Sequence, residues 1–204
     1  MSNFISIDCE STGVHPSCNI LTVAFVIFNK KGEILKELEV KILPPDGIFS
    51  VDPRALEVNK IDLAQHLLEA EPLDKVQNKL RSFLQQATSS VDPSWDGVGD
   101  IRPWIRKTRL VPVGSMVNGD IRWIKDKVLP DLSTYVSHKV QDTVTIAEFL
   151  KSVGILKVEK TGLESLANPF GVVYTPHIAI EDCRAAKDVF LSMIELVKGE
   201  AKIP

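Results

Sequence analysis

Two carboxylates, Asp8 and Glu10, are the first side chains in the sequence that could do chemistry together. They end an isoleucine-rich segment at residues 3–9 that predicts a β-strand, and a spacing of two places both on one strand face. The two charges repel, and a divalent cation that prefers oxygen ligands, Mg²⁺ or Mn²⁺, would relieve the repulsion. An exposed acid pair at a strand end is the alternative in a chain with 27 acids. The position of the pair, directly before the turn at Thr12–Gly13, favours the metal hypothesis.

Asp120, His177 and Asp182, farther along the chain, also suit metal or acid–base chemistry. Each of them has an ordinary structural explanation as well. Asp120 follows Asn118–Gly119 where a helix is predicted to begin, so on its own it is best interpreted as a helix N-cap. His177 and Asp182 are five residues apart, a rotation of about 500° on a helix, and could not share a helical face. They converge only if His177 lies in the loop before the last helix, which Pro176 favours. As an isolated pair they fit an exposed loop histidine and a surface aspartate better.

Cysteine chemistry is a rival hypothesis. The chain has three cysteines, Cys9, Cys18 and Cys183, without a CxxC spacing, which argues against a disulfide framework or a zinc site. We therefore expect a reducing, cytoplasmic compartment. Cys9 with His177 could supply a thiolate nucleophile. Strand alternation argues against this, because it turns Cys9 away from the face of the acid pair and into the core.

Length and composition limit the remaining function classes. The chain has 204 residues, 44% of them apolar, which is enough for a single domain over residues 1–204. A net charge of −3 weakens any picture of a protein that coats duplex nucleic acid with a basic face. Nucleic acid is not excluded as a substrate, because bound cations would offset the acids where a phosphate sits. The chain opens without a charged-then-apolar leader and has no run of about 18 apolar residues, so we expect neither secretion nor a membrane span.

The elements that must position these residues alternate between strand-like and helix-like patterns. Strand-like segments come first at residues 3–9, 20–28 and 33–43, with a Gly-containing turn before the third that predicts an antiparallel hairpin. The remaining predicted elements are helices at 54–60 and 72–87, strands at 109–116 and 138–144, and helices at 120–129, 145–152 and 178–197. This order predicts an α/β domain with a mixed sheet flanked by helices.

Residues 88–108 differ in character from the rest and predict a surface loop or insertion. Ser, Pro, Gly and Asp dominate the segment. It also carries aromatic and cationic residues that could stack on bases and guide phosphates, or equally could bind a partner protein. These residues are Trp95, Arg102, Trp104, Arg106 and Lys107.

Taken together, the blocks around these residues resemble the DEDDh-type 3′–5′ exonucleases of the ribonuclease-H-like superfamily. Three blocks occur in the family's order: FISIDCESTG at 4–13, VGSMVNGDIRWI at 113–124, and HIAIED at 177–182, which fits the family's H-x-A-x-x-D pattern. RALEVNKID at 54–62 is similar to the stretch after the family's third strand. The resemblance spans most of the chain. It implies a ribonuclease-H-like fold with roughly five strands, three antiparallel and then two parallel.

Residues 119–149 look most like the oligoribonuclease branch of this family, including an aspartate before a threonine-rich helix start, Asp142 to Thr145. The chain departs from that branch at Ser115, where asparagine is usual, and in the segment 88–108. Proofreading subunits and single-strand DNA trimming enzymes share the same catalytic set. The choice between DNA and RNA and the substrate length therefore stay open.

The resemblance implies hydrolysis of phosphodiester bonds in single-stranded nucleic acid by two divalent cations, Mg²⁺ or Mn²⁺, about 4 Å apart. It assigns Asp8 to both ions, Glu10 and Asp182 to the first ion, and Asp120 to the second. His177 would be the general base toward the attacking water, so activity should fall as its imidazole is protonated. Nucleoside 5′-monophosphates would leave from the 3′ end.

Two further pairs have both a substrate and a structural interpretation. Thr12 and Gly13 lie where backbone groups could approach the terminal nucleotide, or they form an ordinary strand-end turn. Phe170 and Tyr174 could stack on a base, although core packing fits them better. The expected partners are single-stranded DNA or RNA 3′ ends or short oligonucleotides, no membrane, and a homodimer or a replication or repair partner.

A second hypothesis comes from another class: a catalytically weak, nuclease-like module that binds nucleic acid or tethers a polymerase or helicase. Such modules usually lose one of the metal acids. Here every position of the set is filled, by Asp8, Glu10, Asp120 and Asp182, which favours an enzyme.

Overall fold

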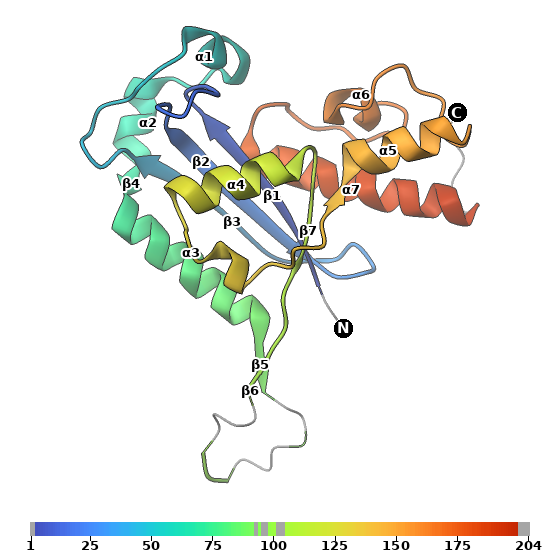
Figure 1. The fold of residues 1–204 in the computed structure, drawn as a ribbon, viewed down its shortest axis with the longest axis horizontal. Coiled ribbons are helices and arrows are strands. Elements are labelled where there is room, and N and C mark those ends of the chain that lie inside the picture. Colours follow the sequence, from blue (N-terminus) through green and yellow to red (C-terminus); the bar gives the residue numbers. More distant parts are fainter. Residues whose placement is uncertain (1–2, 92–93, 95–97, 101–104, 200–204) are drawn as a thin grey trace.

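The computed structural model describes residues 3–91, 94, 98–100 and 105–199, and a mixed six-stranded sheet lies at its centre (Figure 1). Its strands are β1 (Phe4–Ser11), β2 (Ile20–Phe28), β3 (Ile34–Leu43), β4 (Glu71–Pro72), β7 (Val111–Gly114) and β8 (Gln141–Asp142). They lie in the order β4-β3-β2-β1-β7-β8. The first three strands pair antiparallel, and β7 and β8 add parallel beside β1. The predicted α/β class with three antiparallel and two parallel strands is confirmed, and the two-residue β4 extends the sheet beyond it.

Helices cover both faces of this sheet (Figure 1). They are α1 (Pro53–Asn59), α2 (Leu63–Glu69), α3 (Leu73–Thr88), α4 (Val117–Lys127), the 3₁₀ turn η2 (Leu132–Thr134), α5 (Thr143–Ser152), α6 (Leu163–Ala167) and α7 (Ala179–Lys198). α3 and α4 pack on one face, and α7 crosses the other face over β1, β2 and β7. α5 and α6 pack against α7. Among the described residues, no helix combines the length and the apolar character that a membrane crossing needs.

β2 is buried along its whole length because it is flanked by β1 and β3 and covered on both faces. Alternate residues serve the two helix layers. Phe25 joins the cluster beneath α3 and α4, while Ala24 and Val26 pack against α7. A continuous apolar segment is expected of a strand in this position.

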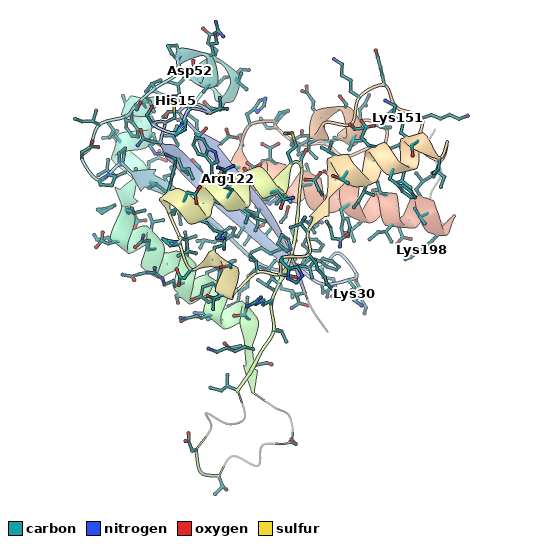
Figure 2. All side chains as sticks on the ribbon, in the orientation of Figure 1. His15, Lys30, Asp52, Arg122, Lys151 and Lys198 are labelled. Carbon is teal, nitrogen blue, oxygen red and sulfur yellow. The ribbon has the colours of Figure 1, made fainter. Side chains whose placement is uncertain are left out.

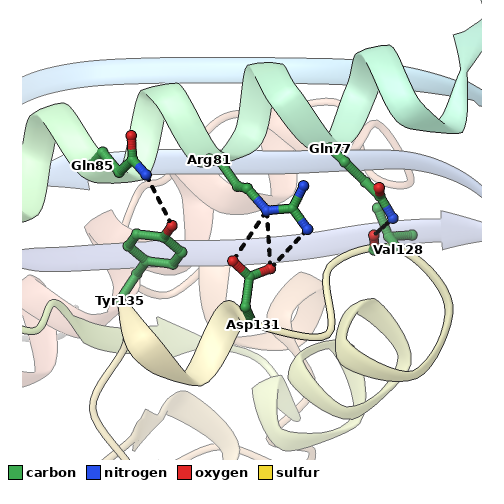
Figure 3. Close-up of polar contacts among 6 residues, drawn as sticks. All are labelled: Gln77, Arg81, Gln85, Val128, Asp131 and Tyr135. Carbon is green, nitrogen blue, oxygen red and sulfur yellow. Dashed lines mark hydrogen bonds and ion pairs between the residues drawn. The ribbon is translucent and has the colours of Figure 1, made fainter.

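Side chains on one side of α3 form hydrogen bonds and an ion pair with the segment that follows α4 (Figure 3). Gln77 donates to the carbonyl of Val128 at 2.8 Å, and Arg81 pairs with Asp131 at 3.1 Å. Gln85, one turn farther along α3, donates to a tyrosine hydroxyl in the same segment at 3.4 Å. The four-residue spacing places all three donors on one helix face. The C-terminal end of α4 is therefore tied to α3.

The segment 88–108 is partly described. Its two ends form an antiparallel ribbon of β5 (Ser89–Val91) and β6 (Ile105–Lys107), which extends away from the main sheet (Figure 1). The prediction of a surface loop or insertion at 88–108 did not include these two short strands. Trp95, Arg102 and Trp104, with their predicted stacking and phosphate-guiding roles, lie outside the described residues.

Several predicted boundaries are wrong by a few residues. The strand expected at 109–116 is limited to β7, and the strand expected at 138–144 is limited to the two residues of β8. The helix expected to begin at Asp120 begins three residues earlier, at Val117. α2 and α6 are absent from the prediction because they are short and have only weak apolar periodicity.

Candidate active site

Three carboxylates converge where β1 meets the beginning of α7. Asp8 and Glu10 point to the same face of β1, and Asp182 lies in the first turn of α7, which crosses that face. One carboxylate oxygen from each residue lies within 4.8 Å of the others. The positive end of the α7 dipole favours acids at this position. Three oxygen donors this close fit a hard divalent cation.

Small residues allow α7 to approach the sheet beside the acids. Ala24, which pairs with Asp8 across β1 and β2, packs against Ala179 and Cys183 of α7. The Cys183 thiol donates to the Ala24 carbonyl at 3.3 Å. Larger side chains here would push the helix away and carry Asp182 with it.

Burial makes the acid cluster electrostatically unfavourable without a cation. It raises the pKa of Asp8 well above its ordinary value, and the charges of Asp120, Asp182 and Glu10 raise it further. Burial also raises the pKa of Glu10 to about 7, where the charge of Asp182 adds to the shift and a hydrogen bond from Asn59 opposes it. A bound divalent cation would favour the ionised forms and remove this penalty.

The neighbours of Asp182 partly offset the effect of burial on its pKa. Burial raises its pKa to about 6, and the opposing influences are the charge of His177 and the backbone N–H groups of His177 and Ile178. The carboxylate is therefore bound to the turn that precedes its own helix. This turn carries the candidate base.

Asp120 enters from α4 and lies beside the triad of Asp8, Glu10 and Asp182. It is the largest charge influence on Asp8, but its oxygens are outside the 4.8 Å group. Burial raises the pKa of Asp120 to about 6, against hydrogen bonds from Cys9. Its interpretation as an N-cap is wrong, because α4 begins at Val117 and Asp120 is the fourth residue of the helix.

Cys9 lies on the α4 side of β1, as strand alternation predicts, and packs against the main apolar cluster. Its Sγ donates to Asp120 Oδ1 at 3.1 Å. Burial raises the pKa of the Cys9 thiol well above its ordinary value, and the neighbouring acids raise it further. A thiol that stays protonated is a poor nucleophile, so the geometry does not support the thiolate hypothesis.

His177 lies in the turn directly before α7, which confirms the predicted loop position. Its backbone has φ of 63°, a left-handed conformation that is uncommon for a non-glycine residue. The exposed side chain lines a cleft of about 770 Å³ that also reaches Glu10, Asn59 and Lys60. Glu10 of the acid cluster and the candidate base therefore line the same cleft.

Thr12 and Gly13 have structural explanations in the turn after β1. The Thr12 hydroxyl is buried and accepts a hydrogen bond from the Asn19 backbone at 2.8 Å. A Cβ on Gly13, whose φ is 149°, would lie 2.8 Å from the Asp52 Cβ and the Cys18 Sγ. Asp52 is seen at this end of the molecule in Figure 2. A substrate role for Thr12 and Gly13 stays a prediction. Phe170 and Tyr174, in contrast, pack against the cluster between α5 and α7.

Two residues near the acid cluster, Asn59 and Glu39, were not predicted from the sequence. Asn59 donates to the Ser11 carbonyl at 2.9 Å and reaches Glu10 from the end of α1. Glu39 of β3 accepts a hydrogen bond from the Ile180 N–H in the first turn of α7 at 3.1 Å. Asn59 belongs to the segment 54–62 that carries the family resemblance, which is a usable signal. Glu39 is one of two acids, with Glu37, that alternate along its strand, so its pattern does not single it out.

No protein-family model and no curated protein matches the chain by sequence. The fold is nevertheless similar to solved structures of exonuclease I. E. coli Exonuclease I with a 5cy-dT13 oligonucleotide has a TM-score of 0.69 and 14% identity, over 98% of this chain and 41% of that chain. A product-bound exonuclease I has a TM-score of 0.68 and 15% identity, over 98% of this chain and 44% of that chain. The zinc-ion-bound E. coli ExoI–ssDNA complex has a TM-score of 0.65 and 16% identity, over 98% of this chain and 41% of that chain.

These identities are low, so the similarity concerns the fold. The chain spans about two fifths of the length of the exonuclease I chains that it matches. Nearly all of its residues take part in the superposition. The chain therefore shares the fold of these exonuclease I structures, and two half-buried carboxylates of β1 meet a buried carboxylate of α7 in it.

Proposed function

We propose that this protein is a metal-dependent 3′–5′ exonuclease that hydrolyses phosphodiester bonds of single-stranded nucleic acid and releases nucleoside 5′-monophosphates. The observation that carries the proposal is the convergence of Asp8, Glu10 and Asp182 within 4.8 Å, on a fold shared with exonuclease I. E. coli Exonuclease I is solved with dT13 and dA16 oligonucleotides, which supports a single strand as the substrate.

In this proposal the four acids would supply the oxygen ligands of two Mg²⁺ or Mn²⁺ ions. Asp8, Glu10 and Asp182 would hold the first ion, and Asp120 together with Asp8 would hold the second. The raised pKa values of these carboxyls are consistent with a site where a cation would stabilise the ionised forms. Cations bound there would polarise the phosphodiester and offset the charge on the departing 3′ oxygen.

His177 is the proposed general base. Its turn places the imidazole on the wall of the cleft that Glu10 also lines, where a water and the terminal phosphate would meet. A neutral imidazole accepts the proton of the attacking water, whereas a protonated one cannot. Lys60 on the same cleft would attract the phosphates of the strand that enters.

Product analysis on single strands labelled at the 3′ or the 5′ end tests the proposal. With Mg²⁺ or Mn²⁺ we expect mononucleotides from a 3′ label at once, and a descending ladder from a 5′ label. EDTA should abolish both. Internal fragments, or no turnover with either metal, would contradict the proposal. Strand binding without turnover would instead favour a nucleic-acid-binding module. Dinucleotides compared with longer DNA and RNA would identify the substrate.

His177→Ala separates the base from the metal site. Loss of a general base should lower kcat by about 10²- to 10⁴-fold, while Mn²⁺ binding is retained. His138→Ala, a change of another exposed histidine, is the matched control and should behave as wild type. A His177→Ala enzyme with the wild-type rate would remove this residue from the mechanism.

A further inference from the structure

The beginning of α4 depends on support from outside the helix. The chain leaves β7 at Gly114 and turns through Met116, the N-cap of α4, whose φ of 57° is left-handed and unfavourable for a non-glycine residue. Within the described chain, Met116 offers no side-chain hydrogen bond to the helix. The turn is also tightly packed, because a Cβ on Gly114 would lie 2.8 Å from Val117 Cβ and 3.0 Å from the Ile7 carbonyl oxygen.

Asp142 supplies the missing cap from the neighbouring strand. It pairs with Gly114 at the end of β8, and its Oδ2 accepts a hydrogen bond from the Val117 N–H at 2.9 Å. Its other oxygen, Oδ1, accepts from the Thr145 N–H at 3.0 Å and caps α5. One carboxylate therefore satisfies the first turns of two helices, where a negative charge is favoured.

The first turn of α4 carries Asp120. Val117 and Asp120 are three residues apart, so a shift of the capped N–H moves the Asp120 carboxylate with it. At this point the Asp120 carboxylate accepts hydrogen bonds from the Cys9 thiol, at 3.1 Å, and from the Cys9 backbone N–H. Burial is the main reason that the pKa of Asp120 is raised, and the nearby charge of Asp142 adds to it.

We infer that Asp142 is a positioning residue for the candidate site: by capping α4 from β8, it fixes where Asp120 stands relative to Asp8. This inference rests on the proposed function insofar as Asp120 holds the second cation. Asp142 acts through the backbone of Val117 and touches neither substrate nor cation. Its loss should therefore weaken the second ion and leave the ion held by Asp8, Glu10 and Asp182 in place.

The two oxygens of Asp142 allow the two caps to be separated. Asp142→Ser keeps a favoured N-cap for α5 but is too short to serve Val117 as well. Asp142→Asn is a second variant in case the first folds poorly, since its amide retains only one acceptor oxygen. Thr145→Val is the matched control, because it removes the weaker hydroxyl contact to Asp142 at 3.3 Å and leaves both backbone bonds.

Mn²⁺ titration by calorimetry without substrate measures the effect on the ions. We expect two ions in the wild type and in Thr145→Val. In Asp142→Ser and Asp142→Asn the weaker ion should lose about 10- to 100-fold in affinity, as outer-shell changes typically cause, and the stronger ion should keep its affinity. Equal loss of both ions, or wild-type affinity for both, would overturn the inference.

Alkylation of Cys9, followed by mass spectrometry, reports on α4 without any metal. The thiol is covered by Asp120, so a displaced first turn should make it react faster in both Asp142 variants and at the wild-type rate in Thr145→Val. Cys18 and Cys183 are buried and serve as internal references. Unchanged Cys9 reactivity would overturn the positioning role. If the wild type binds no Mn²⁺, the proposed function fails, and the alkylation rates still decide whether Asp142 positions Asp120.

Discussion

The two faces of the sheet share the same strands but are packed with side chains of different size. Beneath α3 and α4 large residues predominate: Phe25 is fully buried, stacks with Phe83 at 6.4 Å between ring centroids, and contacts a layer that includes Leu80. Beneath the start of α7 the contacts are made by Ala24 and Ala179. Truncation of a large side chain on the first face should therefore cost more stability than truncation beneath the start of α7.

The size of the side chains also changes along α7 itself. Near the acids α7 contacts alanines and a cysteine, whereas at the far end Phe28 and Phe190 pack together with Phe4. The small residues near the acids leave room for the close approach of α7 that brings Asp182 to Asp8. On the face that forms the site, small side chains allow α7 to lie close to β1 and β2. The opposite face contains the larger buried side chains.

The largest expected effect is the loss of activity when the site face loses its central acid. Asp8→Asn should lower kcat by about 10³-fold, because several kcal/mol of charge stabilisation disappears and each 1.4 kcal/mol is about tenfold. Its free energy of unfolding without metal should stay the same or rise, since a buried repulsive charge is removed. Urea unfolding and initial rates with Mn²⁺ measure the two. Asp126→Asn, at an exposed position on α4, is the control. An active Asp8→Asn enzyme would contradict the proposed role.

Phe25→Ala tests the opposite face and should show the reverse pattern. Truncation of a fully buried phenylalanine typically costs about 3 to 5 kcal/mol of unfolding free energy, from lost burial and the cavity left behind. The rate per folded molecule should be unchanged, because Phe25 points away from the acids. Urea unfolding, with rates measured under conditions where the variant is folded, provides the comparison. A large loss of kcat in fully folded protein would show that the two faces are not independent.

The long strand β2 is predictable from the local sequence pattern, whereas the beginning of α4 is not. The pattern at 20–28 predicts β2 without error because all nine residues are buried by neighbours on both sides. At α4, Asn118–Gly119 reads as a break and Asp120 as a cap, yet the helix begins at Val117. Its cap comes from Asp142, 25 residues away, and no local rule identifies such a contact. For α2 a local signal was present: Asp62 caps the helix by accepting from Ala64.

The candidate site was predictable residue by residue only through the family resemblance. Spacing alone places Asp8 and Glu10 on one face of a strand, and Pro176 places His177 in a loop. Neither argument brings Asp182 to Asp8, because that depends on how closely α7 packs on β2. The alanines that permit the approach are ordinary core residues in sequence, and they acquire meaning only in the fold.

A smaller effect is expected when the spacing of α7 is changed without touching an acid. Ala179→Val adds two carbons to a packed contact, and such over-packing costs about 1 to 3 kcal/mol. Because Asp182 would move outward, Mn²⁺ affinity and kcat should both fall, kcat by up to about 10²-fold for a 1 Å shift. Ala186→Val, equally buried and two turns farther along α7, should cost similar stability with little loss of Mn²⁺ affinity. Identical losses of affinity in both variants would contradict the proximity argument.

The smallest expected effect is a pH-dependent stabilisation by cations, confined to the site face. The pKa of Glu10 is raised to about 7, and those of Asp182 and Asp120 to about 6, so between about pH 4 and 7 the folded state binds more protons than the unfolded state. Metal-free protein should therefore lose stability as pH rises through this window.

At pH 8, Mg²⁺ at ten times its Kd should restore about 1.4 kcal/mol. At pH 5 the protonated acids should bind it weakly and the stabilisation should nearly vanish. Thermal unfolding with Mg²⁺ or EDTA at matched ionic strength measures this, and Asp8→Asn should lose most of the Mg²⁺ response. Equal stabilisation at both pH values would mean that the cation binds elsewhere.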